Sequence, residues 1–267
     1  MKILFLGDVV GISGCSKIMN NLRSEIEKKK IDFVVVNGEN SAEPGVGLTE
    51  KTCKDFFNCG VNVITSGNHV WDQKEIMSYI DKENRLLRPF NLFEPSPGKG
   101  FEIYKTPNDI KVGVLNLMGN VFMKKTDDLF TAAKKLQNKI KLKEQADFLV
   151  VDLHGEITSE KMAMGHYFDG KATAVVGTHT HVPTADTRIL DNGTAFQTDI
   201  GMCGDYNSVI GMNKENSIMK FLKDDKAQRH FPAEDQSTLS GIIVEADHTT
   251  GLANKVERFI YGGVLNH

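Results

Sequence analysis

Five short runs of β-branched and aromatic residues limit how this chain can fold more than any other feature of its sequence. Short apolar runs of this kind are typical of strands buried on both faces of a parallel sheet. The runs are Ile3 to Leu6, Phe33 to Val36, Val61 to Ile64, Phe148 to Val151 and Ala172 to Val176. We therefore expect each of them to form a strand at the centre of a sheet.

Helical patterns lie between several of these runs. The segment from Ser16 to Lys30 places its apolar residues on one helix face. The segment from Thr49 to Cys59 begins with a threonine that can cap a helix and is followed by Gly60, a residue type that commonly ends one. The alternation of strands and helices predicts an α/β fold.

Polar residues with metal-binding side chains follow all five predicted strands. In open α/β sheets ligands bind beyond the carboxyl ends of the strands, so these five loops should meet in one cleft. We expect the glycines among them to permit sharp exits from the strands. The loops are Gly7-Asp8, Asn37-Gly38-Glu39-Asn40, Ser66-Gly67-Asn68-His69, Asp152-Leu153-His154 and Gly177-Thr178-His179-Thr180-His181.

The last loop carries two histidines, His179 and His181, one residue apart. Alternating positions of an extended segment point the same way, so both imidazoles can aim at one target if the chain stays extended beyond Val176. Taken alone, the stretch is equally compatible with a surface turn that happens to carry two histidines. The four other polar strand ends favour a shared target.

The mixture of carboxylate, amide and imidazole side chains in these loops indicates the kind of metal. It suits manganese, iron or zinc, and the absence of cysteine from the loops argues against a soft-metal site. Seven or eight ligands are too many for one ion. Two metals about 3.5 to 4 Å apart, bridged by a carboxylate and a hydroxide, are the common arrangement for phosphoester hydrolysis.

Charge and composition narrow the partners and the compartment. The 32 basic and 35 acidic residues give a net charge of −3, which makes long nucleic acid an unattractive partner because such proteins usually present a basic face. The four cysteines form no CxxC pair and no signal peptide is apparent, so we expect a cytoplasmic location. No stretch approaches the roughly 18 to 20 apolar residues of a membrane span.

The order of the motifs GD, NGEN, SGNH, DLHGE and GTHTH resembles the metallophosphoesterases of the calcineurin-like superfamily. More narrowly, it resembles the YmdB family of bacterial cyclic-nucleotide phosphodiesterases. The resemblance covers nearly the whole chain, so we expect one metallophosphoesterase domain spanning residues 1–267. It rests on GDVVG, NGENSAEPGVGLT, ITSGNHVWDQKEI, LLRPFNL with PGKGF, DLHGEITSEK, VVGTHTHVPTAD and QTDIGMCG.

This resemblance implies a four-layer α/β/β/α sandwich, in which two mixed sheets are flanked by helices. The five apolar runs would supply one of the sheets. The second would include the alternating segments Leu239 to Ala246 and Lys255 to Tyr261, which are typical of an antiparallel hairpin across the Thr250-Gly251 turn.

The resemblance also implies a set of metal ligands in which Glu39 bridges two ions. The ions are expected to be iron or manganese, with zinc as an alternative. Asn40 could instead orient Glu39 by a hydrogen bond. The first ion would be held by Asp8, Glu39, Asn40 and His181, and the second by Glu39, Asn68, His154 and His179.

Two positions depart from the wider superfamily. Val10 stands where a DxH motif would place a histidine, and Glu39 stands where a bridging aspartate is usual. Both departures are compatible with the YmdB branch. They leave the coordination and the identity of the first metal open.

His69 directly follows Asn68 and is not needed as a ligand, so we predict that it is the catalytic proton donor. In a hydrolysis where a metal-bound hydroxide attacks phosphorus, the departing ribose oxygen must be protonated, and histidine suits that step near neutral pH. Asp72 could orient the imidazole. A helix N-cap ahead of Gln73 is the interpretation of Asp72 that the sequence favours.

The resemblance implies that the function is hydrolysis of 2′,3′-cyclic nucleotides, with 3′,5′-cyclic nucleotides as a further candidate substrate and a small phosphodiester as the expected partner. A phosphomonoesterase or nuclease using the same metals is the first alternative, and a metal-stabilised regulatory protein with incidental activity is the second. A dinucleotide-binding module built on Gly7, Gly11 and Gly14 lacks the G-x-G opening. Base preference and assembly into a homo-oligomer stay open.

Overall fold

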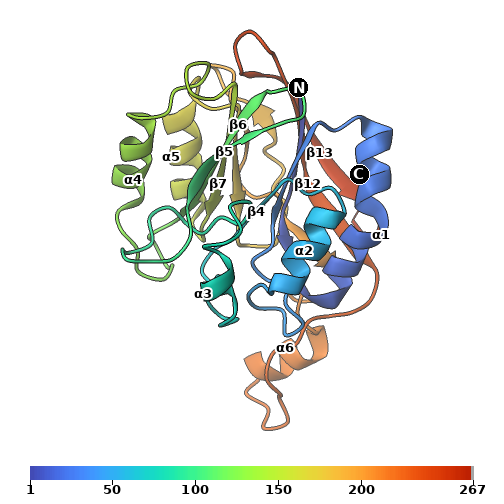
Figure 1. The fold of residues 1–267 in the computed structure, drawn as a ribbon. Coiled ribbons are helices and arrows are strands. Elements are labelled where there is room, and N and C mark those ends of the chain that lie inside the picture. The colour runs from blue at the N-terminus through green and yellow to red at the C-terminus, as the bar shows by residue number, and fades with distance from the viewer. Residues whose placement is uncertain (266–267) are drawn as a thin grey trace.

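The computed structural model describes residues 1–265, in which two β-sheets pack face to face between layers of helices (Figure 1). The predicted domain, residues 1–267, also includes residues 266–267, which lie outside this description. The four-layer α/β/β/α arrangement with two mixed sheets is the one expected from the sequence.

The first sheet runs in the order β2-β11-β12-β1-β3-β4, and β13 pairs with β12. Its β1, β3 and β4 are parallel, whereas β12 lies antiparallel to β1. Its strands are β1 (Lys2–Leu6), β2 (Asp8–Val9), β3 (Phe33–Asn37), β4 (Val63–Thr65), β11 (Met202–Asp205), β12 (Ser237–Ala246) and β13 (Ala253–Tyr261).

The second sheet runs in the order β5-β6-β7-β8-β10-β9. Its four central strands are parallel, and the edge strands β5 and β9 are antiparallel to their neighbours. Its strands are β5 (Phe101–Lys105), β6 (Lys111–Met118), β7 (Phe148–His154), β8 (Ala174–Thr178), β9 (Arg188–Ile189) and β10 (Ala195–Gln197).

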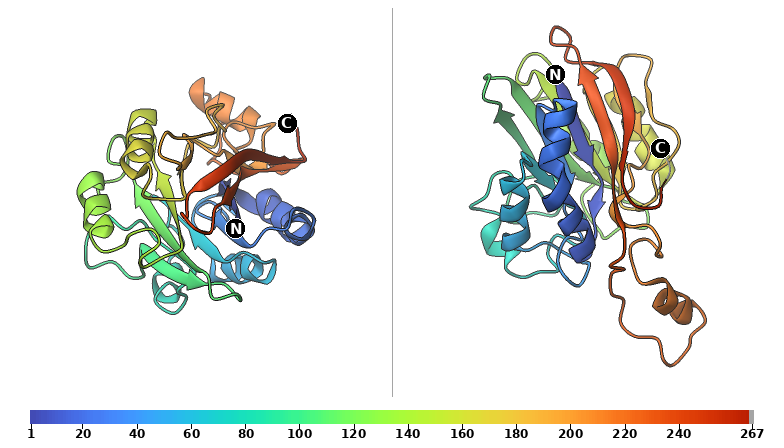
Figure 2. Two further views of the ribbon diagram at one scale, coloured as in Figure 1. Left: turned by 90° about the horizontal axis from the view of Figure 1, so that it is seen from above. Right: turned by 90° about the vertical axis from the view of Figure 1, so that its right-hand side faces the viewer.

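Helices cover the outer face of each sheet, as the two turned views in Figure 2 also show. Helices α1 and α2 lie on the first sheet, and α4 and α5 lie on the second (Figure 1). The helices are α1 (Gly11–Lys29), α2 (Glu50–Asn58), α3 (Ile76–Tyr79), α4 (Leu129–Gln137), α5 (Thr158–Phe168) and α6 (Lys214–Phe221).

The period-two geometry of a strand explains why β1 is apolar throughout. Ile3 and Phe5 point into the core between the two sheets, while Leu4 and Leu6 point into the core under the helices. All four side chains are buried. A strand covered on both faces cannot alternate apolar and polar residues, which is why the sequence shows a continuous run.

Two sequence-based expectations about the sheets are wrong. The five apolar runs do not form one sheet, because the first three lie in the first sheet and the last two, in β7 and β8, lie in the second. The C-terminal hairpin of β12 and β13 is antiparallel as predicted, but it joins the first sheet. An apolar run indicates that both faces are covered but does not say whether a helix or another sheet covers them.

The helices predicted from the sequence agree better with the structure than the predicted sheets do. Thr49 is the N-cap of α2 and its side chain accepts a hydrogen bond from the N–H of Thr52, as expected. Helix α1 begins at Gly11, five residues before the predicted start. A Cβ on Gly14 would lie 2.2 Å from the carbonyl oxygen of Cys203, so this glycine permits close packing of α1 on the sheet.

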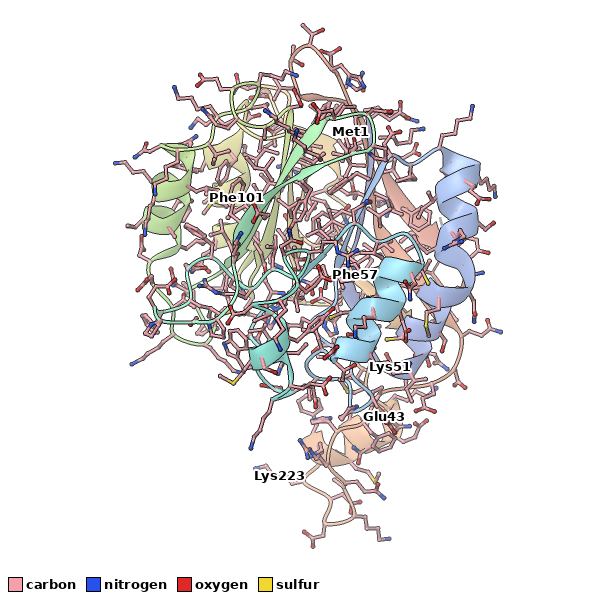
Figure 3. The ribbon with its side chains drawn as sticks, in the orientation of Figure 1. Met1, Glu43, Lys51, Phe57, Phe101 and Lys223 are labelled. Atoms are coloured by element: carbon pink, nitrogen blue, oxygen red, sulfur yellow. The ribbon has the colours of Figure 1, made fainter. Side chains whose placement is uncertain are left out.

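The parallel strands of both sheets end at the same edge of the molecule. This is the lower edge in Figure 1, from which the segment carrying α6 projects. Glu43, in the loop after β3, and Lys223, just beyond α6, are labelled there in Figure 3. Within residues 1–265, no helix has the length and apolarity needed to cross a membrane.

The core between the sheets should carry much of the stability. Phe5 is 1% exposed in that core, so Phe5→Ala should lower the free energy of unfolding by roughly 3–5 kcal/mol, as is usual for a buried aromatic residue. Phe221, at the end of α6, is 83% exposed, and Phe221→Ala should change it by less than about 0.5 kcal/mol. Urea denaturation of the two variants measures the difference, and equal losses would contradict the layer assignment.

Candidate metal centre

All eight residues predicted for the site lie at this shared edge. The first sheet contributes Asp8, which begins β2, and the residues that follow β3 and β4. The second contributes His154, the last residue of β7, and the residues that follow β8. The sheets therefore supply opposite halves of one site. The residues that follow the strands are Glu39 and Asn40 after β3, Asn68 and His69 after β4, and His179 and His181 after β8.

Three side chains converge on the Nε2 atom of His154. This nitrogen lies 3.0 Å from Glu39 Oε1, 3.0 Å from Asn68 Oδ1 and 3.0 Å from His179 Nδ1. One ligand atom from each of Glu39, His154 and His179 lies within 4.8 Å of the others, as a shared cation requires. Together with His154, these residues are the set predicted for the second metal.

The hydrogen bonds of His154 determine which of its ring nitrogens faces this cluster. The Thr178 hydroxyl donates its single proton to Asp152 Oδ1 at 2.8 Å, so it must accept a hydrogen bond from His154 Nδ1, 3.0 Å away. Burial lowers the pKa of His154 to about 4. The ring is therefore neutral near pH 7, and its Nε2 turns a lone pair to the cluster.

The same logic applies to His179 and His181. His179 Nε2 lies 3.1 Å from Glu156 Oε2, and His181 Nδ1 lies 2.8 Å from the carbonyl oxygen of Ile210. Both partners can only accept, so each ring donates a hydrogen bond there. Burial lowers the pKa of His179 to about 2, which keeps this ring neutral as well.

The set predicted for the first metal contains three buried oxygens that lack hydrogen-bond partners. Among residues 1–265, Asp8 Oδ1, Asn40 Oδ1 and Glu39 Oε1 are buried with no hydrogen-bond donor. Asn40 Nδ2 lies 3.2 Å from His181 Nε2, so its side chain contacts His181 and does not donate to Glu39. A buried acceptor without a donor is costly, and a cation would satisfy all three.

Gly67 shows how tightly the cluster is enclosed. A Cβ at this position would lie 2.2 Å from Glu39 Oε2 and 2.3 Å from His154 Nε2. Gly67 has no unusual φ, so glycine is required there for close approach and not for the sharp exit that the sequence suggested. The unpartnered oxygens, the bare imidazole nitrogens and this close approach together fit a bound transition metal.

The loop that carries the two histidines does not stay extended as predicted. Strand β8 ends at Thr178, and His179 and His181 have φ values of 101° and 67°. These values are uncommon for residues with side chains and persist only when the surroundings impose them. The two imidazoles thus reach this edge through a strained turn and not along an extended chain.

A buried ion pair that sequence inspection overlooked holds this turn. Lys161 Nζ lies 2.7 Å from Asp199 Oδ2, and both side chains are 1% exposed. Asp199 Oδ2 also accepts hydrogen bonds from the N–H and the hydroxyl of Thr180, at 3.0 and 2.8 Å. Thr180 lies between the two histidines. The motifs DLHGEITSEK and QTDIGMCG contain the pair, but nothing in either indicates that they meet.

Burial also changes the acidity of the carboxyl groups. It raises the pKa of Asp8 and of Glu39 to about 7, and that of Asp152, beneath the cluster, to about 7 as well. Asp152 accepts hydrogen bonds from Thr65, Thr178 and Asn37. A bound cation would favour the ionised forms of Asp8 and Glu39.

His69 lies at the rim, and its surroundings correct the interpretation of Asp72. His69 Nδ1 lies 2.7 Å from Asp72 Oδ2, so the carboxylate orients the imidazole. Helix α3 starts only at Ile76, and its N-cap is Glu75, so Asp72 is not a helix N-cap. The sequence favoured the cap because three polar residues preceded an apolar one, a pattern that here forms turns instead.

A pocket of about 300 Å³ opens above the cluster. Its lining includes Glu39, His69 and the two histidines after β8, together with Ile210 and Met212 from the segment that leads to α6. Val10, which stands in place of the superfamily histidine, is buried, and its backbone pairs with Asn40 as an isolated bridge. It supplies no ligand.

A sandwich of two mixed sheets, with a cluster of carboxylate and imidazole groups at the carboxyl ends of its strands, places the chain in the metallophosphoesterase class. Residues 4–259 match the family model described as YmdB-like protein. The chain belongs to this family, as the motif resemblance predicted.

Three relatives are similar to this chain over nearly its whole length. The chain is 44% identical over 260 residues to the 2′,3′-cyclic-nucleotide 2′-phosphodiesterase of Bacillus subtilis strain 168, covering 97% of each chain. A novel phosphatase of Mycoplasma pneumoniae matches with a TM-score of 0.89 and 38% identity over 98% of this chain and 93% of that one. A hypothetical protein of Thermus thermophilus matches with a TM-score of 0.90 and 35% identity over 98% of this chain and 100% of the other.

The raised pKa of Glu39 predicts how pH affects the metal-free protein. With a pKa of about 7 in place of 4.5, neutral Glu39 favours folding below about pH 4.5, and this contribution is lost as the pH rises through 7. In the presence of a chelator, the stability of wild type relative to Glu39→Gln should fall by about 3 kcal/mol between these limits. Urea denaturation of both proteins across this range measures it, and a constant difference would contradict the prediction.

Proposed function

We propose that this protein is a metal-dependent phosphodiesterase that hydrolyses 2′,3′-cyclic nucleotides. The observation that carries the proposal is the shared direction of two imidazoles: His154 and His179 each donate one ring N–H away from the cluster and turn an unprotonated nitrogen toward it, beside the Glu39 carboxylate. The activity named for the relative in Bacillus subtilis gives the substrate class.

The proposed ligand sets follow the two groups of contacts. Asp8, Asn40 and His181 would hold one ion, Asn68, His154 and His179 would hold the other, and Glu39 would bridge them. Two such ions, iron or manganese, would neutralise the phosphate and lower the pKa of a water molecule.

The chain's own residues would orient the substrate and move the proton. A water oxygen attacks phosphorus and releases one proton to solvent, the bond from phosphorus to one ribose oxygen breaks, and that oxygen leaves with a proton from His69, which regains a proton from solvent. His69 Nδ1 is hydrogen-bonded to Asp72. The other ring nitrogen, Nε2, is therefore the atom that would donate a proton to the leaving oxygen. The pocket of about 300 Å³ suits a nucleotide better than a polymer, which argues against a nuclease.

One prediction from this proposal tests the metal bridge together with the substrate class. Wild type should carry up to two iron or manganese ions and hydrolyse a 2′,3′-cyclic nucleotide faster than a 3′,5′-cyclic nucleotide, a nucleoside monophosphate or a single-stranded oligonucleotide. Glu39→Ala should lose both ions, because a bridging carboxylate neutralises two cations, whereas Asp8→Ala or His154→Ala should lose mainly one. Elemental analysis and a substrate panel measure this.

Several outcomes of that experiment would count against the proposal. A preference for the monophosphate would favour the phosphomonoesterase alternative; the Mycoplasma pneumoniae structure is named only as a novel phosphatase. Full metal content in Glu39→Ala would show that Glu39 is not the bridge. Absence of stoichiometric metal in wild type, with no stimulation by manganese, would exclude the metal centre.

A second prediction concerns the proton donor. His69→Ala should keep its metals but lose roughly a hundred- to ten-thousand-fold in turnover of the cyclic nucleotide, the usual contribution of a general acid. A nitrophenyl phosphodiester should lose much less, because nitrophenolate departs readily without a proton. Turnover of both substrates, with metal content measured in parallel, distinguishes these effects. An equal loss on both, or loss of metal, would assign His69 another role.

A further inference from the structure

The strongest unassigned feature beside the site is Lys124, in the loop between β6 and α4. Its Nζ atom lies 2.5 Å from the carbonyl oxygen of Asn68 and 3.7 Å from Asp72 Oδ1. The other oxygen of Asp72 holds His69. One ammonium group therefore contacts both ends of the short loop that carries the proposed proton donor.

The contact spans the two sheets. Asn68, His69 and Asp72 follow β4 of the first sheet, whereas Lys124 follows β6 of the second. The sheets are joined at this edge by side chains, so the position of the His69 loop relative to the ligands from β7 and β8 depends on such contacts. Through Lys124 the second sheet reaches the His69 loop.

The loop that delivers Lys124 is itself anchored. The N–H of Gly119 donates to the carbonyl oxygen of His154 at 2.9 Å. The Asn120 side chain donates to Thr126 Oγ1 at 2.9 Å and accepts from the N–H of Leu129 at 2.8 Å, which closes the loop on itself. The loop that carries Lys124 is therefore held by hydrogen bonds at its start, and the first of these joins it to His154, a proposed metal ligand.

We propose that Lys124 is a positioning residue that holds the Asn68–Asp72 loop, and through Asp72 the His69 imidazole, in the orientation needed to protonate the leaving group. This inference rests on the proposed function. Lys124 is not assigned a contact with substrate, because its ammonium group is directed to Asn68 and Asp72. Its role is to restrict the conformations of the Asn68–Asp72 loop.

This contact should contribute little to the stability of the fold. The side chains of Lys124 and Asp72 are 59% and 33% exposed, and exposed ion pairs contribute only about 0–1 kcal/mol to folding. Replacement of Lys124 should thus leave the protein folded, and an effect on turnover would reflect geometry. A small misplacement of a catalytic group is enough to slow a reaction strongly.

The test compares Lys124→Met with Lys125→Met, the adjacent exposed lysine, as a matched control. Lys124→Met should lose about ten-fold or more in kcat on a 2′,3′-cyclic nucleotide but less than about two-fold on a nitrophenyl phosphodiester, because only the first needs the general acid. Lys124→Arg should recover part of the loss, and Lys125→Met should match wild type. Metal content should be unchanged in all three.

A double-mutant cycle adds a measurement that a general structural role would not reproduce. If Lys124 acts through His69, the variant carrying both His69→Ala and Lys124→Met should be no slower than His69→Ala, to within about two-fold. Additive losses, equal losses on the two substrates, loss of metal, or a normal rate in Lys124→Met would each overturn the inference. Failure of wild type to hydrolyse the cyclic nucleotide would instead overturn the proposed function.

Discussion

The convergence of electron-rich atoms at one sheet edge is the constraint on which the rest of the structure depends. Glu39, Asn68 and His179 each place an oxygen or nitrogen 3.0 Å from the bare Nε2 of His154. Such atoms repel one another, and Glu39 and His154 are buried away from water. The surrounding chain must therefore hold them together in the absence of a cation, and a layer of hydrogen-bonded side chains around Asp152 lies beneath them.

That layer works by fixing protons and backbone conformations. Asp152 orders the Thr178 hydroxyl, which in turn decides the tautomer of His154. The buried Lys161–Asp199 pair holds Thr180, and with it a turn that contains two residues at positive φ. A buried ion pair of this kind is weak evidence for stability. Here the pair has a different role: through the hydrogen bonds of Thr180 to Asp199, it holds the histidine loop in a conformation that this loop would not adopt alone.

The site belongs to neither sheet alone. The first sheet carries both carboxylates, Asp8 and Glu39, while the second carries the three imidazoles. This division places the pocket between the two sheets, where Lys124 of the second sheet's β6–α4 loop also contacts Asn68 beside the first sheet. A single open sheet could have brought the same residue types to one edge. Two sheets packed face to face allow the ligands to surround a small volume from opposite sides.

The sequence by itself determined the buried strands, the polar loops that end them and the family, because strand periodicity and ligand chemistry are local properties. It named the eight residues that the structure brings to one edge, although their roles as ligands and as proton donor stay predictions. Only the tertiary structure decided that the five strands divide between two sheets, that His179 and His181 converge through a strained turn, and that Asp72 orients His69. The partnership of Lys161 with Asp199, and of Lys124 with Asn68, was likewise hidden. Each of these depends on contacts between residues far apart in the chain or on backbone angles imposed by packing, and neither leaves a pattern in neighbouring letters of the sequence.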